Sequence, residues 1–427
     1  MKSRAPALSA RARGAADPPI SRLMHAALSR PELVSLAAGF VDQASLPVEA
    51  TRGAIDGVLE DPACARAALQ YGTTAGDLPL REQVLSRVLE QDAHDERVPV
   101  ARCVPRPEQV VLTAGSNQLL YLLAESLLDP GDIVLCQAPT YFVYLGILRT
   151  LGARAVGVRC DDAGLCCDEL EATLLRLADS GELARVKAIY VMSYFDNPRS
   201  LSLPRERRAE LIDIARRFAR AQPIYIIEDA AYRELRFGGD DAASLRAHDA
   251  DGDIVAYTGT FSKAFAPGIR VGFGILPEAL KQAVLDLKGN LDFGSPLFNQ
   301  RIVSEALRRG LYEPHVAALR DVYARKLDAM VQALDTQLGQ PGLARYNRPQ
   351  GGLYVWASLP RGIDTSVGAG LFERALDEGV LYVPGAYCYP EPDAEARRTV
   401  RLSFGVQSEA RIAEGVERLA RALRRML

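Results

Sequence analysis

Residues 257–274 read YTGTFSKAFAPGIRVGFG and place one lysine, Lys263, among small and apolar residues. The runs on either side, DIVAYTGT and RVGFGILP, have the composition of buried strands. A lysine at such a junction is costly to bury unless its amine has a chemical role. The stretch therefore predicts a strand-rich core with a functional residue at its edge.

Outward from this stretch, strand and helix patterns alternate between about residues 105 and 275. Five further strands are expected, at EQVVLTA, DIVLCQAP, ARAVGVRC, VKAIYVMSY and PIYIIED, with helices of ten or more residues among them. Such alternation indicates a mostly parallel sheet covered by helices on both faces. We therefore expect an α/β fold whose large domain contains a mostly parallel seven-stranded sheet flanked by helices.

The remainder of the chain predicts a second, smaller α+β domain, formed by the N-terminal segment and the C-terminal third. Beyond Gly342 the runs GGLYVWASLP, GVLYVPGA and TVRLSFGV are short strands, and a helix closes the chain. The expected division is a partly disordered arm over 1–30, the N-terminal part of the small domain over 31–60, the large domain over 61–310, and a connecting helix with the rest of the small domain over 311–427.

Composition limits the classes of partner. The chain has 427 residues, a net charge of −3 and four scattered histidines. This charge balance gives no reason to expect nucleic acid or an anionic membrane as a partner, and the histidines give none to expect a metal site. The seven cysteines include no C-x-x-C pair, which favours free thiols in a reducing cytoplasm.

Polar and aromatic residues follow the strands of the predicted large sheet. In such sheets ligands bind at the carboxyl ends of the strands, which lie along one edge. Five predicted strands are followed there by Gly115-Ser116-Asn117, by Thr140-Tyr141, by Asn197-Pro198, by Asp229 with Tyr232, and by Thr260, Ser262 and Lys263. We expect these residues to line one site.

Three of these groups match different parts of one ligand. The Gly-Ser-Asn turn at a helix start, with Thr260, Ser262 and Arg270, suits a phosphate, although the turn alone is equally typical of a helix N-cap. Asp229 is expected to be buried and needs a cationic partner such as a pyridinium, although D-x-x-Y also occurs in surface turns. A neutral Lys263 amine can condense with an aldehyde to form a Schiff base. Phosphate, pyridine nitrogen and aldehyde together describe pyridoxal 5′-phosphate.

At this point the sequence resembles a known family, the fold-type I, class I/II aminotransferases that use pyridoxal phosphate, from about residue 31 onward. The similar segments are GTFSKAFAPGIRVGF, IEDAAY, YFDNPRS, APTY, AGSNQ, YGTTAGDLPLREQV, VRLSFG and SLAAGF. Their order and spacing are closest to the branch that includes aminoadipate and aromatic amino-acid aminotransferases.

The resemblance implies a role for each matching residue. Lys263 is the Schiff-base lysine, Asp229 pairs with the pyridine nitrogen, and Tyr232 and Asn197 reach the ring hydroxyl. Tyr141 stacks on the ring, and the phosphate ligands are Ser116, Asn117, Thr260, Ser262 and Arg270, with Tyr71 from the neighbouring subunit of a homodimer. Arg401 and the backbone at Gly39 bind the substrate α-carboxylate, with Asn197 beside them.

Two segments depart from the family pattern. The turn usually written N-P-T-G or N-P-A-G is Asn197-Pro198-Arg199-Ser200 here, which adds a charge close to Asn197. The entrance segment GFVDQASLP is also unusual, and it lies where substrate side chains are often sorted. Arg22 can either reach an acidic distal group of the substrate or be an ordinary solvated helix charge. These features leave the substrate open.

The predicted activity is transfer of an amino group between an L-amino acid and a 2-oxo acid by a ping-pong mechanism. The same machinery also performs lyase, decarboxylase and oxidase-like reactions, and these remain alternatives. A transcriptional regulator is disfavoured because only about 30 residues precede the resemblance, too few for a helix-turn-helix module. A Rossmann dehydrogenase is disfavoured because no G-x-G-x-x-G follows an early strand.

Overall fold

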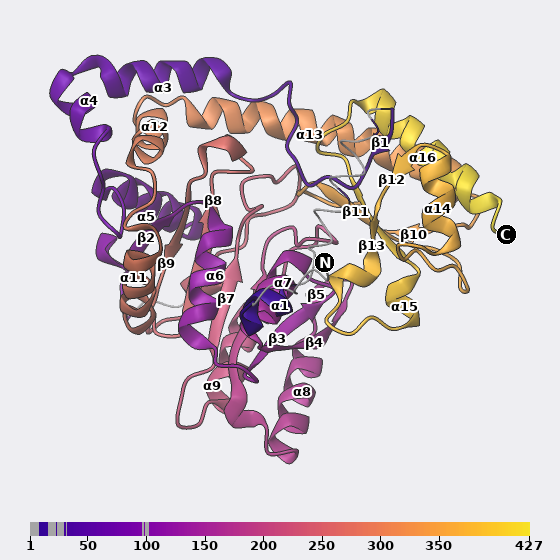
Figure 1. The fold of residues 1–427 in the computed structure, drawn as a ribbon, viewed down its shortest axis with the longest axis horizontal. Helices are drawn as coiled ribbons and strands as arrows, with labels where there is room; N and C mark the ends of the chain where they lie inside the picture. The colour runs from indigo at the N-terminus through magenta and orange to yellow at the C-terminus, as the bar shows by residue number, and fades with distance from the viewer. Residues whose placement is uncertain (1–7, 16–22, 24–29, 31, 96–97, 99–101) are drawn as a thin grey trace, which may run out of the picture.

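A computed structural model of the chain describes residues 8–15, 23, 30, 32–95, 98 and 102–427 (Figure 1). Arg22 and most of the arm expected over residues 1–30 lie outside the described residues. Helix α1 (Ala10–Gly14) is the first described element; its N-cap Ser9 accepts a hydrogen bond from the backbone of Ala12. Arg11 in this helix donates to Glu125 at 2.9 Å, which ties α1 to the large domain.

The large sheet contains eight strands, and the seven predicted ones are confirmed. In spatial order they are β2 (Val110–Thr113), β9 (Gly272–Ile275), β8 (Val255–Thr260), β7 (Tyr225–Asp229), β6 (Val186–Met192), β3 (Ile133–Ala138), β4 (Arg154–Asp161) and β5 (Gly164–Leu165). Pairing is parallel from β8 through β4, whereas β9 is antiparallel to both β8 and β2. The unpredicted strand β5 has two residues and is antiparallel to β4, too short for a sequence pattern to reveal.

The core lies on both faces of this sheet. Along β3, Ile133 and Leu135 belong to one apolar cluster and Val134 and Cys136 to the other, as the two-residue period of a strand requires. One cluster is covered by α8 (Cys167–Asp179) and α9 (Arg205–Phe218). The other includes side chains of α5 (Leu78–Asp92), α6 (Ser116–Leu127), α7 (Phe142–Leu151), α11 (Glu278–Asp292) and α12 (Leu297–Arg308).

The smaller sheet has four antiparallel strands, β10 (Arg345–Tyr346), β11 (Tyr354–Ser358), β14 (Thr399–Ser403) and β13 (Val383–Pro384). Helix α13 (Tyr312–Leu334) leads to it, and α14 (Gly370–Asp377) and α16 (Glu409–Arg424) lie beside it (Figure 1). Two short helices remain: α10 (Leu245–His248) belongs to the large domain, and α15 (Ala394–Arg397) lies near β14.

The N-terminal segment reaches both parts of the molecule. Strand β1 (Val34–Ser35) pairs in parallel with β12 (Val380–Leu381), which joins the segment to the C-terminal third. Helix α3 (Val48–Glu60), which continues into α4 (Pro62–Ala68), contacts α12 instead. The exact domain boundaries, including the one at residue 60, stay a prediction.

Three further observations concern the described part of the chain. None of its helices is long and apolar enough to cross a membrane. It holds no cluster of three or more His, Cys, Asp or Glu side chains arranged to bind a metal ion. All seven cysteines are free.

Candidate active site

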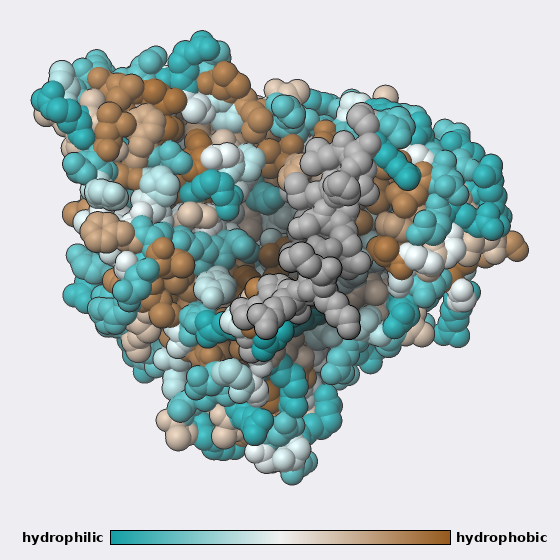
Figure 2. All heavy atoms as spheres, viewed as in Figure 1, coloured by the Kyte–Doolittle hydropathy of each residue, from teal (hydrophilic) through white to brown (hydrophobic). Residues whose placement is uncertain are grey.

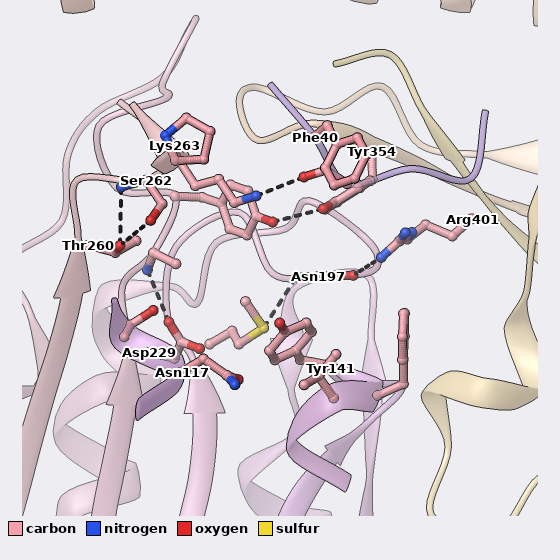
Figure 3. A pocket seen from close by; sticks show the side chains of 18 of the residues that line it. Phe40, Asn117, Tyr141, Asn197, Asp229, Thr260, Ser262, Lys263, Tyr354 and Arg401 are labelled. Atoms are coloured by element: carbon pink, nitrogen blue, oxygen red, sulfur yellow. Dashed lines mark hydrogen bonds between the residues drawn. The ribbon is translucent and has the colours of Figure 1, made fainter. Parts of the chain in front are cut away.

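A cavity of about 290 Å³ lies where the large and small sheets meet, and the carboxyl ends of β6, β7 and β8 open into it (Figure 3). The loops after these strands, the starts of α6 and α7, the entrance segment at residues 39–40, and strands β11 and β14 complete its wall. Twelve of the predicted site residues line it, namely Gly39, Ser116, Asn117, Tyr141, Asn197, Asp229, Tyr232, Thr260, Ser262, Lys263, Arg270 and Arg401. Residues distant in sequence are therefore brought to one edge, as the strand-end argument predicts.

One end of the cavity suits an anion. Helix α6 begins at Ser116 after Gly115, whose φ is 81°, and no side chain caps its first turn. Arg270 lies beside this turn, with Nη2 donating to the Ala114 carbonyl at 3.2 Å and Nη1 to the Ser262 hydroxyl at 3.3 Å. A Cβ at Gly115 would stand 2.5 Å from Arg270 Nη2, so this close approach requires glycine. Uncapped N–H groups, a guanidinium and hydroxyls together can hold a phosphate.

At the end of β7, Asp229 is a buried carboxylate without a cationic partner in the described chain. The Tyr190 hydroxyl donates to Oδ2 at 2.8 Å and the Ala231 N–H to Oδ1 at 3.1 Å. Burial raises the pKa of Asp229 to about 6, against these two hydrogen bonds, which lower it. A cationic ring N–H placed next to Asp229 would stabilise the ionised carboxylate.

The amine of Lys263 projects into the cavity and donates to the Gly39 carbonyl at 2.8 Å (Figure 3). Burial lowers the pKa of Lys263, and the positive charges of Arg401 and Arg270 lower it further, against an opposing effect of Tyr354. A lower pKa increases the fraction of neutral amine, the form that is nucleophilic and basic.

Arg401, on β14, is the third cation of the cavity and is 1% exposed. Its Nη1 donates to Asn197 Oδ1 at 2.9 Å and its Nη2 to the Ala37 carbonyl at 2.7 Å. Its buried Nε has no hydrogen-bond partner in the described chain, and no described carboxylate forms an ion pair with it. A buried guanidinium without a carboxylate partner suits an anionic ligand such as a carboxylate.

Comparison with known proteins identifies the family. The sequence model of aminotransferase class I and II matches residues 31–419. The chain belongs to this family.

The aminotransferase is 36% identical over 401 residues to the 2-aminoadipate transaminase of Thermus thermophilus, covering 93% of this chain and 92% of the relative. It is 33% identical over 393 residues to aromatic-amino-acid aminotransferase 1 of Thermococcus litoralis, covering 92% and 88%. The crystal structure of LysN, the α-aminoadipate aminotransferase of Thermus thermophilus, complexed with N-(5′-phosphopyridoxyl)-L-leucine, has a TM-score of 0.83 to this structure at 33% identity, covering 98% of each chain. The predicted family and branch are confirmed.

The cofactor of the aminotransferase is pyridoxal 5′-phosphate, as predicted. The cavity fits this molecule on the observations above. The anion site at the start of α6 suits its phosphate, the unpaired Asp229 carboxylate suits its ring nitrogen, and the Lys263 amine suits its aldehyde.

Two tyrosines that contact predicted site residues of the aminotransferase escaped the sequence analysis. The Tyr354 hydroxyl lies 2.9 Å from the Tyr232 hydroxyl, and its ring centroid lies 4.2 Å from the Arg401 guanidinium carbon. Tyr190 holds Asp229, as described above. Both belong to strands, Tyr190 to β6 and Tyr354 to the start of β11. Only residues that follow strand ends were selected from the sequence pattern, so these two were not included.

The charge added by Arg199 stays out of the cavity. Arg199 is 8% exposed and donates through Nε and Nη2 to Asp196 Oδ2 at 3.1 and 2.8 Å. Its Nη1 donates to the Asp161 carbonyl at 2.9 Å. Asn197 lines the cavity and Arg199 does not. The departure from the family turn therefore leaves the charge of the active site unchanged.

The unusual entrance segment is anchored to α13. Phe40 stands at the mouth of the cavity and is 49% exposed. Two residues further on, Asp42 Oδ1 accepts from Lys326 Nζ at 2.6 Å, and the Asp42 N–H donates to the Tyr323 hydroxyl at 3.0 Å. This buried ion pair anchors the segment whose Gly39 carbonyl accepts from Lys263.

Tyr71 is the one predicted site residue that does not line the cavity. It is 80% exposed, and its ring centroid lies 5.5 Å from that of Phe293. Tyr71 does not reach the cavity of its own chain, so its predicted role requires a second subunit.

Proposed function

We propose that the enzyme transfers the amino group of an L-amino acid to a 2-oxo acid by a ping-pong mechanism in which Lys263 is both the covalent cofactor residue and the proton carrier. The observation that carries the proposal is the Lys263 amine, buried in the cavity with a lowered pKa and hydrogen-bonded to a backbone carbonyl. The same cavity contains Asp229 and Arg401, the groups that suit a ring nitrogen and a carboxylate.

In this proposal the cavity would hold the cofactor from several sides. Asp229 would keep the ring nitrogen protonated, Tyr141 would stack on the ring, and Asn197 and Tyr232 would bind its hydroxyl. The phosphate would be bound by Ser116, Asn117, Thr260, Ser262 and Arg270. When bound, pyridoxal phosphate supplies an aldehyde for the amino group and a ring that accepts electrons from the bonds of the substrate Cα.

The remaining steps belong to the protein. Arg401 and the backbone at Gly39 bind the substrate α-carboxylate and so fix which bond of Cα is aligned for cleavage. The neutral Lys263 amine would take the proton from the substrate Cα as a general base and, once protonated, would donate it to the cofactor side of the reacting bond as a general acid. Its lowered pKa favours the neutral form that this first transfer needs.

We further propose a cytoplasmic homodimer in which Tyr71 of each chain completes the other chain's phosphate site. Support comes from apolar side chains left exposed on this side of the molecule, Val48, Leu59, Leu69, Tyr71, Leu78, Leu291 and Phe293. Figure 2 shows apolar surface gathered near α3 and α12 at the upper left. Large exposed apolar patches commonly mark protein interfaces. The free thiols favour the cytoplasm.

The test is a panel of amino donors, including L-2-aminoadipate, L-phenylalanine and L-leucine, against 2-oxoglutarate and pyruvate, with every product identified. We expect formation of a 2-oxo acid that depends on both substrates. Release of ammonia or carbon dioxide instead would indicate a lyase, oxidase or decarboxylase. Lys263→Ala is expected to abolish turnover and the borohydride-trapped link to the cofactor. Full multiple-turnover activity in this variant would contradict the mechanism.

A further inference from the structure

We propose that Ser200 is a positioning residue for the substrate carboxylate. Its hydroxyl joins the loop that carries Asn197 to Tyr354, and these two residues contact Arg401 from opposite parts of the fold. The proposal rests on the function proposed above and concerns a position where this chain departs from its family.

The loop adopts a backbone conformation that serine does not favour. Every residue from 193 to 200 is buried, and Phe195 and Ser200 have φ values of 45° and 55°. Glycine adopts this left-handed region without a steric penalty, whereas a residue with a Cβ does not. A serine at position 200 therefore needs a compensating interaction.

Closure of the turn does not depend on the Ser200 side chain. The Ser200 N–H donates to the Asp196 carbonyl at 2.6 Å, and the Asp196 N–H donates to the Leu201 carbonyl at 2.8 Å. Asp196 Oδ1 also accepts from the N–H groups of Arg199 and Leu201, each at 3.1 Å, and its Oδ2 accepts from Gln137 Nε2 at 3.2 Å. The backbone and Asp196 thus hold the turn, and the Ser200 hydroxyl is free for another contact.

That contact is with the backbone of Tyr354. Ser200 Oγ accepts from the Tyr354 N–H at 3.3 Å. The Leu353 carbonyl accepts a hydrogen bond from the Phe404 N–H, so Leu353 directs its backbone groups toward the strand that contains β14. Successive residues of an antiparallel strand alternate in this direction, so the backbone groups of Tyr354 point away from β14. On the other side β10 pairs only with Ala357 and Ser358. The hydroxyl therefore satisfies a buried N–H that no neighbouring strand reaches.

Tyr354 in turn contacts Arg401, the residue proposed to bind the substrate carboxylate. Its ring lies over the Arg401 guanidinium, its hydroxyl contacts that of Tyr232, and a Cβ at Gly39 would stand 2.7 Å from its hydroxyl oxygen. Ser200 follows β6 of the large sheet and Tyr354 begins β11 of the small one, so the hydrogen bond spans the two halves of the cavity. Gly352 leaves room for it, because a Cβ there would stand 2.7 Å from Ser200 Oγ.

A pair of variants separates positioning from stability. Ser200→Ala removes the acceptor and keeps the backbone penalty, whereas Ser200→Gly removes both. If the hydroxyl positions Tyr354, both variants raise the KM for the best amino donor by about 3- to 10-fold, the range expected for one lost hydrogen bond. The affinity for pyridoxal phosphate stays within about twofold, because no phosphate or ring contact changes. The thermal midpoint of Ser200→Gly lies above that of Ser200→Ala.

The matched control is Ser202→Ala. Ser202 Oγ accepts from the Phe195 N–H at 3.2 Å in the same loop and has no contact with Tyr354, so KM is expected to stay at the wild-type value. Recovery of wild-type KM in Ser200→Gly, together with its higher midpoint, would show a purely structural role and overturn the proposal. So would unchanged KM in both variants, or failure of both to bind pyridoxal phosphate. A wild-type enzyme that transaminates no donor would instead refute the proposed function.

Discussion

Replacing Asp229 by asparagine is expected to stabilise the cofactor-free enzyme and to weaken the enzyme that contains cofactor. Among the described residues of the cofactor-free chain, the buried carboxylate has two hydrogen-bond donors and no cationic partner. Burial raises its pKa from 3.8 to about 6. The carboxyl is ionised at pH 7.5 in both the folded and the unfolded chain, and burial makes this ionised form less favourable in the folded chain than in the unfolded one.

The size of the effect follows from the pKa shift. A rise from 3.8 to about 6, at about 1.4 kcal/mol for each pKa unit, corresponds to about 3 kcal/mol of lost stability above pH 6. As the pH falls from 6 towards 4, the carboxyl of the folded chain binds its proton before that of the unfolded chain does, and the loss of stability disappears. Asparagine is neutral throughout and loses one hydrogen bond, worth about 1 kcal/mol. We therefore expect Asp229→Asn to be more stable than wild type by about 2 kcal/mol at pH 7.5, and less stable by about 1 kcal/mol near pH 4.

The assay is urea unfolding of both cofactor-free proteins at one protein concentration between pH 4.5 and 8. A stability difference that stays constant across this range would refute the reasoning, because the other titrating groups are common to both proteins. Tyr190→Phe is the control. It removes the hydrogen bond that holds the Asp229 pKa down, so it should destabilise the chain at pH 7.5 and much less at pH 4.5. Saturating pyridoxal phosphate should stabilise wild type more than Asp229→Asn.

The remaining predictions concern the entrance segment and the second subunit. Asp42→Asn leaves the buried Lys326 amine without its carboxylate and should cost about 3 kcal/mol in urea unfolding at pH 7. Burial raises the pKa of Asp42, but Lys326 and the hydrogen bonds from Ser45 together outweigh it and lower the net value, so the difference should shrink below pH 4; a constant difference would contradict this. Tyr71→Phe should weaken cofactor binding about 10-fold or more. Mixing Tyr71→Phe chains with Lys263→Ala chains should form mixed dimers in which one of the two sites is wild type. No gain in activity on mixing would refute a site shared between subunits.

Most of the site could be predicted because its residues follow strand ends. Asp229 ends β7, Thr260 ends β8, and Asn197 follows β6, so a parallel sheet brings them to one edge whatever the details of packing. Lys263 and Arg270 are close in sequence and lie in the one loop that joins β8 to β9. Arg401 is different: it lies in the middle of β14, and only the resemblance to a family indicated its role.

Contacts between the two sheets could not be predicted in this way. Tyr354 and Ser200 are 154 positions apart, and the hydrogen bond between them depends on where the small sheet rests against the large one. The sequence also left open whether Arg199 adds a charge to the active site. Asp196 neutralises it and holds it away from the cavity, an outcome set by the backbone of the turn.

The sequence by itself determined the α/β fold, because strand and helix periodicity is a local property of the chain, and its ordered segments carried the resemblance that indicated the family and the cofactor. Tertiary structure alone decided which groups meet across the cavity: Tyr354 with Tyr232, and Arg401 with Asn197. These pairings depend on the relative placement of two sheets, and no pattern within a single segment of the chain records that placement.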